Sequence, residues 1–179
     1  MRLGSVLHSV RMSEPRPPGL PFVVSVRVRY ADTDAEGVVY YGSYLTYFEV
    51  ARVELLRALG CPVAEVRRRG VVLPAVHAEC RYLRPARVDD LLEVRMWLLP
   101  MKRATIGFVY EVWRDDELLA EGSTLHATVD ARTGKVVRRP GWLNELVELA
   151  PGVIGSVAAP PRQRGTPRRS LDCRRAARG

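Results

Sequence analysis

The stretch that decides the fold is Ser43–Leu59, which reads SYLTYFEVARVELLRAL. Apolar side chains recur in it at intervals of four, three, four and four residues, which places them on one face of an α-helix: Tyr44, Phe48, Ala51, Leu55 and Leu59. Gly60 and Pro62 follow and predict that the helix ends there. Four more apolar side chains widen this surface beyond a single stripe: Leu45, Tyr47, Val50 and Leu56. We therefore expect a long helix that is wrapped on several sides.

Around this helix the sequence has the patterns of β-strands. Residues 22–30 alternate between apolar and polar side chains, which predicts a strand with one solvent-facing side. Four later segments rich in Val, Leu and aromatic residues are also expected to be strands: 71–83, 91–99, 105–114 and 118–129. Asp115-Asp116 predicts a hairpin, residues 130–134 predict a turn, and shorter helices are expected at 62–69 and 142–149. This order predicts an α+β fold with an antiparallel sheet, and it lacks the βαβ alternation and glycine-rich loop of a dinucleotide-binding fold.

The formal charge of +8 lies at the ends of the 179-residue chain, because residues 22–150 carry 18 basic and 18 acidic side chains. We expect a flexible leader over 1–21, one domain over 22–150, and a basic Pro/Arg-rich tail over 151–179 without regular structure. The balanced domain does not favour a nucleic-acid partner, whereas contact of the tail with a polyanion stays open. No apolar run approaches the ~18 residues that span a bilayer. The odd number of cysteines, three, fits reduced thiols in the cytoplasm.

Residues 30–44 place three acidic side chains and two glycines between a strand and the helix. Asp32, Asp34 and Glu36 match the first, third and fifth ligand positions of a calcium-binding EF-hand loop. However, the twelfth position is Ser43 instead of a glutamate, and the preceding element is a strand. Aspartate-based phosphoryl transfer needs a parallel sheet with helical crossovers, which the predicted strand order lacks. A capping turn that satisfies free N–H groups at the helix start is the remaining alternative.

The same segment resembles the signature of the hotdog-fold acyl-CoA thioesterases, in the branch of 4-hydroxybenzoyl-CoA thioesterase and the thioesterases of the Tol–Pal operon. The matching residues are Tyr30, Asp32-Thr33-Asp34, Gly37-Val38-Val39-Tyr40, Tyr44, Phe48-Glu49 and Arg52. The resemblance covers roughly residues 22–148. It implies a hotdog fold, in which a curved antiparallel sheet wraps a long central helix. It also implies hydrolysis of an acyl-CoA thioester without a metal or a cofactor.

In this branch the catalytic carboxylate is the second aspartate of the motif, so the resemblance implies that Asp34 acts as nucleophile or general base. It also implies that a backbone N–H at the helix start, here that of Tyr41, stabilises the oxyanion. Many members carry histidine at this position, so an imidazole role there is absent or reassigned. Asp32 is expected to order the loop. Glu49 is a second acidic candidate, and we expect it to form an ion pair with Arg52.

The same resemblance implies three kinds of contact with the substrate. A glycine turn lets the backbone approach it closely, aromatic side chains surround the acyl group, and cations bind the CoA phosphates. The residues so assigned are Gly37, Val38, Tyr40, Tyr44, Lys102 and Arg103. His77 and His126 lie on predicted strands and are expected to be structural. The implied partners are an acyl-CoA or an acyl carrier protein thioester, and further copies of the chain in a homodimer or homotetramer. A non-catalytic acyl-thioester binding protein on the same fold is the alternative function.

Overall fold

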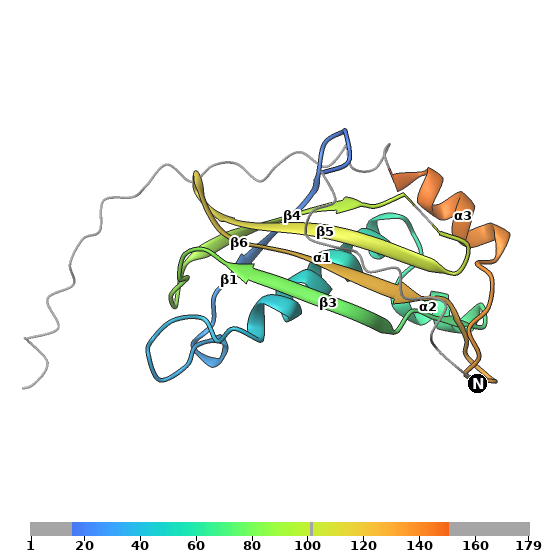
Figure 1. Cartoon of the computed structure of the whole chain (residues 1–179), viewed down its shortest axis with the longest axis horizontal. Coiled ribbons are helices and arrows are strands. Elements are labelled where there is room, and N and C mark those ends of the chain that lie inside the picture. The colour runs from blue at the N-terminus through green and yellow to red at the C-terminus, as the bar shows by residue number, and fades with distance from the viewer. Residues whose placement is uncertain (1–15, 101, 151–179) are drawn as a thin grey trace, which may run out of the picture.

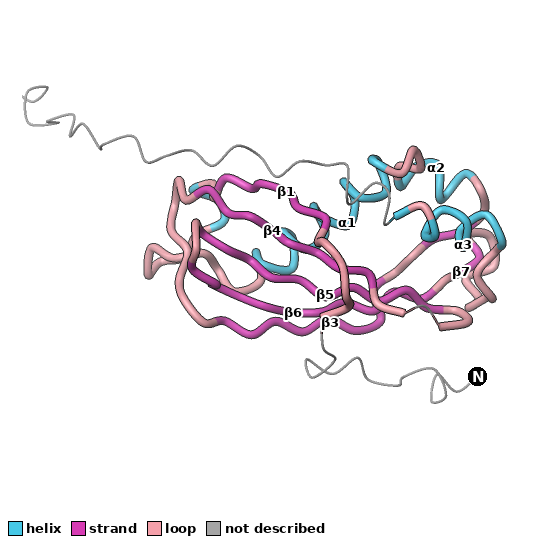
Figure 2. Tube along the Cα trace, turned by 90° about the horizontal axis from the view of Figure 1, so that it is seen from above, coloured by secondary structure: helices cyan, strands magenta, loops and turns pink. Residues whose placement is uncertain are grey.

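Helix α1 (Ser43–Ala58) lies across one face of a five-stranded antiparallel sheet that curves around it (Figure 1). The computed structural model describes residues 16–100 and 102–150. The strand order is β1-β4-β5-β6-β3, which Figure 2 shows side by side. The strands of this sheet are β1 (Phe22–Arg27), β3 (Ala75–Tyr82), β4 (Leu91–Leu98), β5 (Thr105–Arg114) and β6 (Glu117–Ala127). The expected α+β class is confirmed.

The remaining elements are short and cover one end of the sheet. Helices α2 (Val63–Arg68) and α3 (Gly141–Glu148) lie at the same end of the molecule in Figures 1 and 2. Strands β2 (Val71–Val72) and β7 (Val129–Asp130) pair as a separate two-stranded sheet. None of the helices in the described part of the chain is long and apolar enough to cross a membrane.

Contact between α1 and the sheet centres on Phe48, whose ring stacks on Tyr110 of β5 with centroids 4.3 Å apart. Both side chains are fully buried. Gly122 of β6 permits this approach, because a Cβ there would lie 2.6 Å from the Phe48 ring and 2.4 Å from the carbonyl oxygen of Glu79. An aromatic side chain on the helix and a bare backbone on the strand thus set the helix–sheet distance.

The sheet wraps α1 as expected, but one side of the helix remains open. Tyr47 and Leu56 are buried, but Leu45 is 39% exposed and Glu49 is also exposed. A single sheet can cover only part of the surface of a helix. The side of α1 that carries Leu45 and Glu49 therefore remains open within one chain. This open side faces the edge of the sheet formed by β3.

Two of the expected strands are each divided in the structure. Residues 71–83 form β2 and β3, separated by Leu73 and Pro74, and proline cannot donate an N–H to a ladder. Residues 118–129 end in β6 at Ala127, and β7 starts at Val129 to pair with β2. The first strand ends at Arg27 because the chain turns into the 3₁₀ segment η1 (Tyr30–Asp32).

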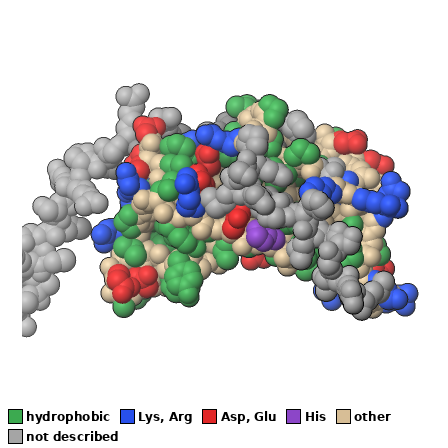
Figure 3. All heavy atoms as spheres, viewed as in Figure 1, with side chains coloured by type: hydrophobic (Ala, Val, Ile, Leu, Met, Phe, Trp, Pro, Cys, Tyr) green, Lys and Arg blue, Asp and Glu red, His purple; other side chains and the backbone are tan. Residues whose placement is uncertain are grey.

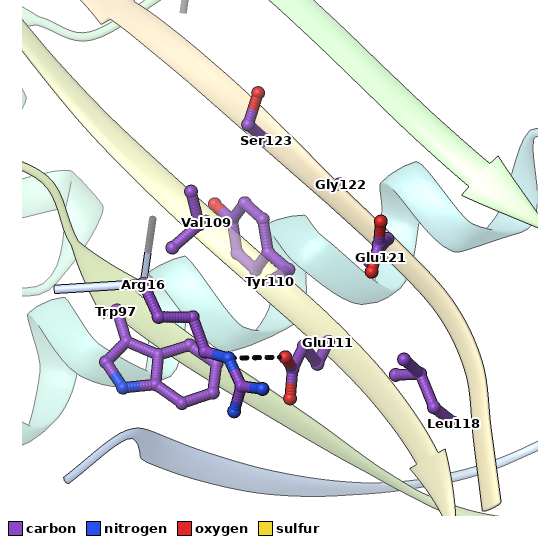
Figure 4. A pocket seen from close by; sticks show the side chains of 9 residues that line it. All are labelled: Arg16, Trp97, Val109, Tyr110, Glu111, Leu118, Glu121, Gly122 and Ser123. Carbon is purple, nitrogen blue, oxygen red and sulfur yellow. Dashed lines mark ion pairs between the residues drawn. The ribbon is translucent and has the colours of Figure 1, made fainter. Parts of the chain in front are cut away.

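The outer face of the sheet, opposite α1, mixes charged and apolar side chains (Figure 3). Arg16 lies on this face, where its Nε is 3.0 Å from Glu111 Oε1 and its guanidinium carbon is 5.6 Å from the centre of the Trp97 ring (Figure 4). Trp97 Nε1 donates to the carbonyl oxygen of Gly19 at 3.2 Å. Residues 16–20 of the expected leader are therefore held against the sheet. Residues 1–15 of that leader and the basic tail over 151–179 lie outside the described residues.

Candidate active site

A tight loop between η1 and α1 orients the Asp34 carboxylate. The loop closes on itself through an isolated bridge between Thr33 and Val39, with Asp34 N–H donating to Val38 O at 2.9 Å. Asp34 Oδ1 accepts the backbone N–H of Glu36 at 3.1 Å and that of Val38 at 3.5 Å. Oδ2 has no hydrogen bond to the described residues, and the side chain is half-buried. One carboxylate oxygen is thus positioned by the backbone while the other is available.

Gly37 allows the loop to turn back, because its φ is +72°, in the left-handed region that glycine adopts without steric cost. Its N–H donates to Asp34 O at 3.0 Å. Gly37 is exposed and Val38 is half-buried, so both lie at the surface beside the Asp34 carboxylate.

Asp32 is held in a different way from Asp34, although both belong to the same motif. It is 5% exposed, and its Oδ1 lies 2.6 Å from Arg29 Nη2 while its Oδ2 accepts the Arg29 backbone N–H at 2.9 Å. Hydrogen bonding from the Arg29 side chain lowers the pKa of the Asp32 carboxyl. Burial, followed by the nearby Asp32 charge, raises the pKa of Tyr47. Asp32 therefore orders the loop, as expected.

The start of α1 presents free backbone donors. Ser43 N–H donates to Tyr40 O at 2.9 Å, whereas the N–H groups of Tyr41 and Gly42 donate to none of the described residues. The Tyr41 carbonyl oxygen accepts the Tyr82 hydroxyl at 3.0 Å, which anchors this turn to β3. The side chain of Tyr41 is 62% exposed and leans on Tyr40, with ring centroids 4.2 Å apart. Free N–H groups together with the helix dipole favour negative charge at this point.

Tyr44 and the Lys102–Arg103 turn lie apart from this loop surface. Tyr44 is 3% exposed and packs edge-on against Tyr82, so within one chain it belongs to the core. The Lys102–Arg103 turn follows β4 at its Leu98 end, whereas the Asp34 loop adjoins the Leu91 end (Figure 1). An eight-residue strand spans about 25 Å, so one protomer does not bring these cations to Asp34.

Residues 28–147 match the family model described as the thioesterase-like superfamily. The chain belongs to this superfamily. It is 37% identical over 122 residues to the acyl-CoA thioesterase YbgC of Haemophilus influenzae, covering 66% of this chain and 88% of that protein. A crystal structure of a hypothetical protein from Aquifex aeolicus superposes with a TM-score of 0.68 at 36% identity, covering 70% of this chain and 98% of that one.

A 1,4-dihydroxy-2-naphthoyl-CoA thioesterase from Synechocystis superposes with a TM-score of 0.65 at 25% identity, covering 78% of this chain and 98% of that one. These matches confirm the resemblance to the thioesterases, the hotdog fold and the enzyme class of thioester hydrolases. The superfamily match spans the Asp34 loop, α1 and four strands of the five-stranded sheet, and it begins one residue after β1.

A cavity beside α1 was not predicted from the sequence. It has a volume of about 340 Å³ and lies between the open side of α1 and strands β3 and β6. Its lining is Leu45, Glu49, Arg52, Leu73, Pro74, Ala75, Ala78, Tyr110, Thr124 and His126. The available signal was the recurrence of Leu45, Glu49 and Arg52 at helical spacing outside the buried stripe. The expected ion pair of Glu49 with Arg52 is present, with Oε1 and Nη2 3.6 Å apart.

Proposed function

We propose that this chain hydrolyses acyl-CoA thioesters to the free acid and coenzyme A, with Asp34 as nucleophile or general base and the Tyr41 N–H as oxyanion donor. The observation that carries the proposal is that both groups belong to one short segment, residues 34–41, between η1 and α1. One oxygen of Asp34 is fixed by backbone N–H groups, and the other has no hydrogen bond to the described residues. At the start of α1, the N–H groups of Tyr41 and Gly42 also donate to none of the described residues. The family membership supports the same reaction class.

Either role of Asp34 completes the reaction with the same products. As a nucleophile, Oδ2 bonds to the thioester carbonyl carbon and expels the CoA thiolate, and water then cleaves the resulting anhydride. As a general base, Oδ2 takes a proton from a water molecule whose oxygen attacks that carbon, and the proton ends on the departing sulfur. In both cases negative charge develops on the carbonyl oxygen, where a free N–H at the helix start stabilises it.

We propose that two copies of the chain pair along β3. This strand is an edge of the sheet, with Val76 and Tyr82 exposed, so one side of its backbone has no strand partner among the described residues. Antiparallel pairing would set the Tyr82 end of one protomer beside the Ala75 end of the other. The Lys102 turn lies at the Ala75 end, so the second copy would bring the cations toward the Asp34 loop for the CoA phosphates. A homotetramer would be two such dimers.

We also propose that residues 22–150 form the thioesterase domain and that the protein works in the cytoplasm. The free thiols of Cys61 and Cys80 support the second statement. The balanced charge of this domain supports an acyl-thioester ligand instead of a nucleic acid.

Steady-state release of the CoA thiol tests the reaction. A panel of acetyl-, octanoyl-, palmitoyl- and benzoyl-CoA is offered to the wild type, Asp34→Asn and Asp34→Ala. We expect the variants to lose about 10³-fold or more in kcat with substrates that the wild type hydrolyses. Equal rates in wild type and variants would refute the role of Asp34. Saturable binding of acyl-CoA without turnover of CoA or acyl carrier protein thioesters would favour the binding-protein alternative.

A further inference from the structure

The cavity beside α1 contains a cation without hydrogen-bond partners. The Arg52 side chain is 13% exposed, and it forms no hydrogen bond with another described residue. Its Nη2 lies 3.6 Å from Glu49 Oε1, which is too long for a hydrogen bond, and the Glu49 side chain is 65% exposed. A guanidinium group has five N–H donors, and none of those of Arg52 is used in a hydrogen bond to a described residue, so they are available to a ligand.

The hydrogens of Tyr110, Thr124 and His126 in the lining are already donated to other protein groups. His126 Nδ1 lies 3.0 Å from the Leu73 carbonyl oxygen, which can only accept, so Nδ1 carries the hydrogen. Burial, followed by the charge of Arg52, lowers the pKa of His126 to about 4, so the ring is neutral near pH 7 and its Nε2 can only accept. The Thr124 hydroxyl therefore donates to Nε2 at 3.0 Å, and the Tyr110 hydroxyl donates to Thr124 Oγ1 at 3.0 Å.

Arg52 is therefore the only lining side chain with hydrogens left to donate. It is also the one positive charge in the lining, and the one negative charge, Glu49, has its side chain 65% exposed to solvent. The rest of the lining is mostly apolar, from Leu45 and Leu73 to the β3 residues Ala75 and Ala78. The cavity thus suits a carbon skeleton that ends in a group of hydrogen-bond acceptors.

The position of Arg52 along α1 relates this cavity to the proposed oxyanion donor. Gly42, Leu45, Glu49 and Arg52 follow one another at intervals of three, four and three residues, so they lie along one side of the helix. Helical side chains point back toward the N-terminus. The guanidinium of Arg52 therefore lies about 10 Å from the helix start, roughly the reach of an eight-carbon acyl chain.

Building on the proposed thioesterase function, we propose that this cavity takes the distal part of the acyl group and that Arg52 selects acyl chains that end in a carboxylate. A planar guanidinium binds a carboxylate through two parallel N–H···O bonds, which a methyl end cannot form. Glu49 does not occupy these donors, because it is largely in solvent and lies beyond hydrogen-bond distance. Arg52 is a specificity residue in this scheme and takes no part in bond cleavage.

The test compares two thioesters with the same carbon skeleton, octanoyl-CoA and suberoyl-CoA, which differ by a methyl or a carboxylate at the far end. Both are offered to the wild type, Arg52→Lys and Arg52→Met, and to the control Arg57→Met, an exposed arginine that pairs with Glu54. We expect wild-type kcat/KM to favour suberoyl-CoA by about 10-fold or more. The ratio should fall at least about 10-fold in Arg52→Met, by less in Arg52→Lys, and should keep its wild-type value in Arg57→Met.

Calorimetric binding of both thioesters to Asp34→Asn, alone and combined with Arg52→Met, separates this proposal from the proposed function. A preference for the carboxylate that depends on Arg52 in these Asp34 variants supports the site even if Asp34 proves dispensable for turnover. An equal or reversed wild-type preference, or a ratio that Arg52→Met leaves unchanged, would overturn the proposal. It would also be overturned if Arg52→Met changed the sedimentation mass and lowered both rates alike, because Arg52 would then serve a contact between subunits.

Discussion

Arg29 and Asp32 form a two-point contact at the base of the site loop. Arg29 Nη2 lies 2.6 Å from Asp32 Oδ1, and the backbone N–H of the same arginine donates to Asp32 Oδ2 at 2.9 Å. Both oxygens of this buried carboxylate are thus occupied, while Asp34 Oδ2 forms no hydrogen bond with the described residues. Two aspartates that look equivalent in the sequence are therefore distinguished by their hydrogen bonds.

The first prediction concerns Asp32→Asn, which removes the charge from this contact. We expect a loss of about 2 kcal/mol in the free energy of unfolding at pH 7, measured with urea. Because the folded state lowers the pKa of Asp32, the stabilisation is present above about pH 4 and is lost as the pH falls through the folded pKa. The difference between variant and wild type should therefore shrink in acid.

Asp34→Asn is the matched control for this experiment. An asparagine oxygen can still accept the N–H groups of Glu36 and Val38, so stability should change by less than about 0.5 kcal/mol. Equal urea midpoints for the two variants would contradict the structural role of Asp32.

A second prediction concerns Gly122, where α1 meets the sheet. A Cβ at this position would lie 2.6 Å from the Phe48 ring and 2.4 Å from the backbone oxygen of Glu79, so the helix or the strand must shift. We expect Gly122→Ala to cost about 3 kcal/mol of unfolding free energy. Gly107→Ala is the control, because its Cβ would meet the movable Leu99 side chain at 3.0 Å, and it should cost less than about 1 kcal/mol. Similar losses in both variants would contradict the packing argument.

The sequence was sufficient to predict those helices and strands whose signals lie within the segment itself. The helix over 43–59 is present as Ser43–Ala58, because its apolar spacing and the following Gly60 and Pro62 act within the segment itself. Strand boundaries at 71–83 and 118–129 were wrong, since the division of each depends on pairing between β2 and β7, which are far apart in sequence. The exposed side of α1 was also missed, because apolar periodicity does not show how much of a helix one sheet can cover.

At the candidate site, the family resemblance led us to expect a loop-ordering role for Asp32, which agrees with its hydrogen bonds to Arg29, whereas the catalytic role of Asp34 stays a prediction. It could not reveal the cavity at Arg52, because that cavity is enclosed by residues from α1, β3 and β6. Nor could it show that the Lys102 turn lies at the far end of the sheet from Asp34, which follows from the antiparallel course of β4.

A third prediction uses His126, which is buried and neutral in the folded protein. Burial lowers its pKa to about 4, whereas an unfolded chain protonates histidine near pH 6.5. Between these values the unfolded state binds the extra proton, so stability should fall as the pH falls from about 6.5 to about 4, by roughly 3 kcal/mol from this group. Urea unfolding of His126→Gln across this range should show a shallower loss than wild type. Parallel curves for His126→Gln and wild type would refute this assignment.

The last prediction tests the backbone of the loop that carries Asp34. Gly37 has a φ of +72°, and a Cβ there would meet no atom within 4 Å, so any cost of substitution comes from the backbone alone. We expect Gly37→Ala to lower the free energy of unfolding by about 1 kcal/mol. Gly37→Asn should cost less, because asparagine tolerates the left-handed region. Urea unfolding at pH 7 measures both. If alanine and asparagine were as stable as glycine, the loop would not need a left-handed residue at position 37, and the orientation of Asp34 could not depend on it.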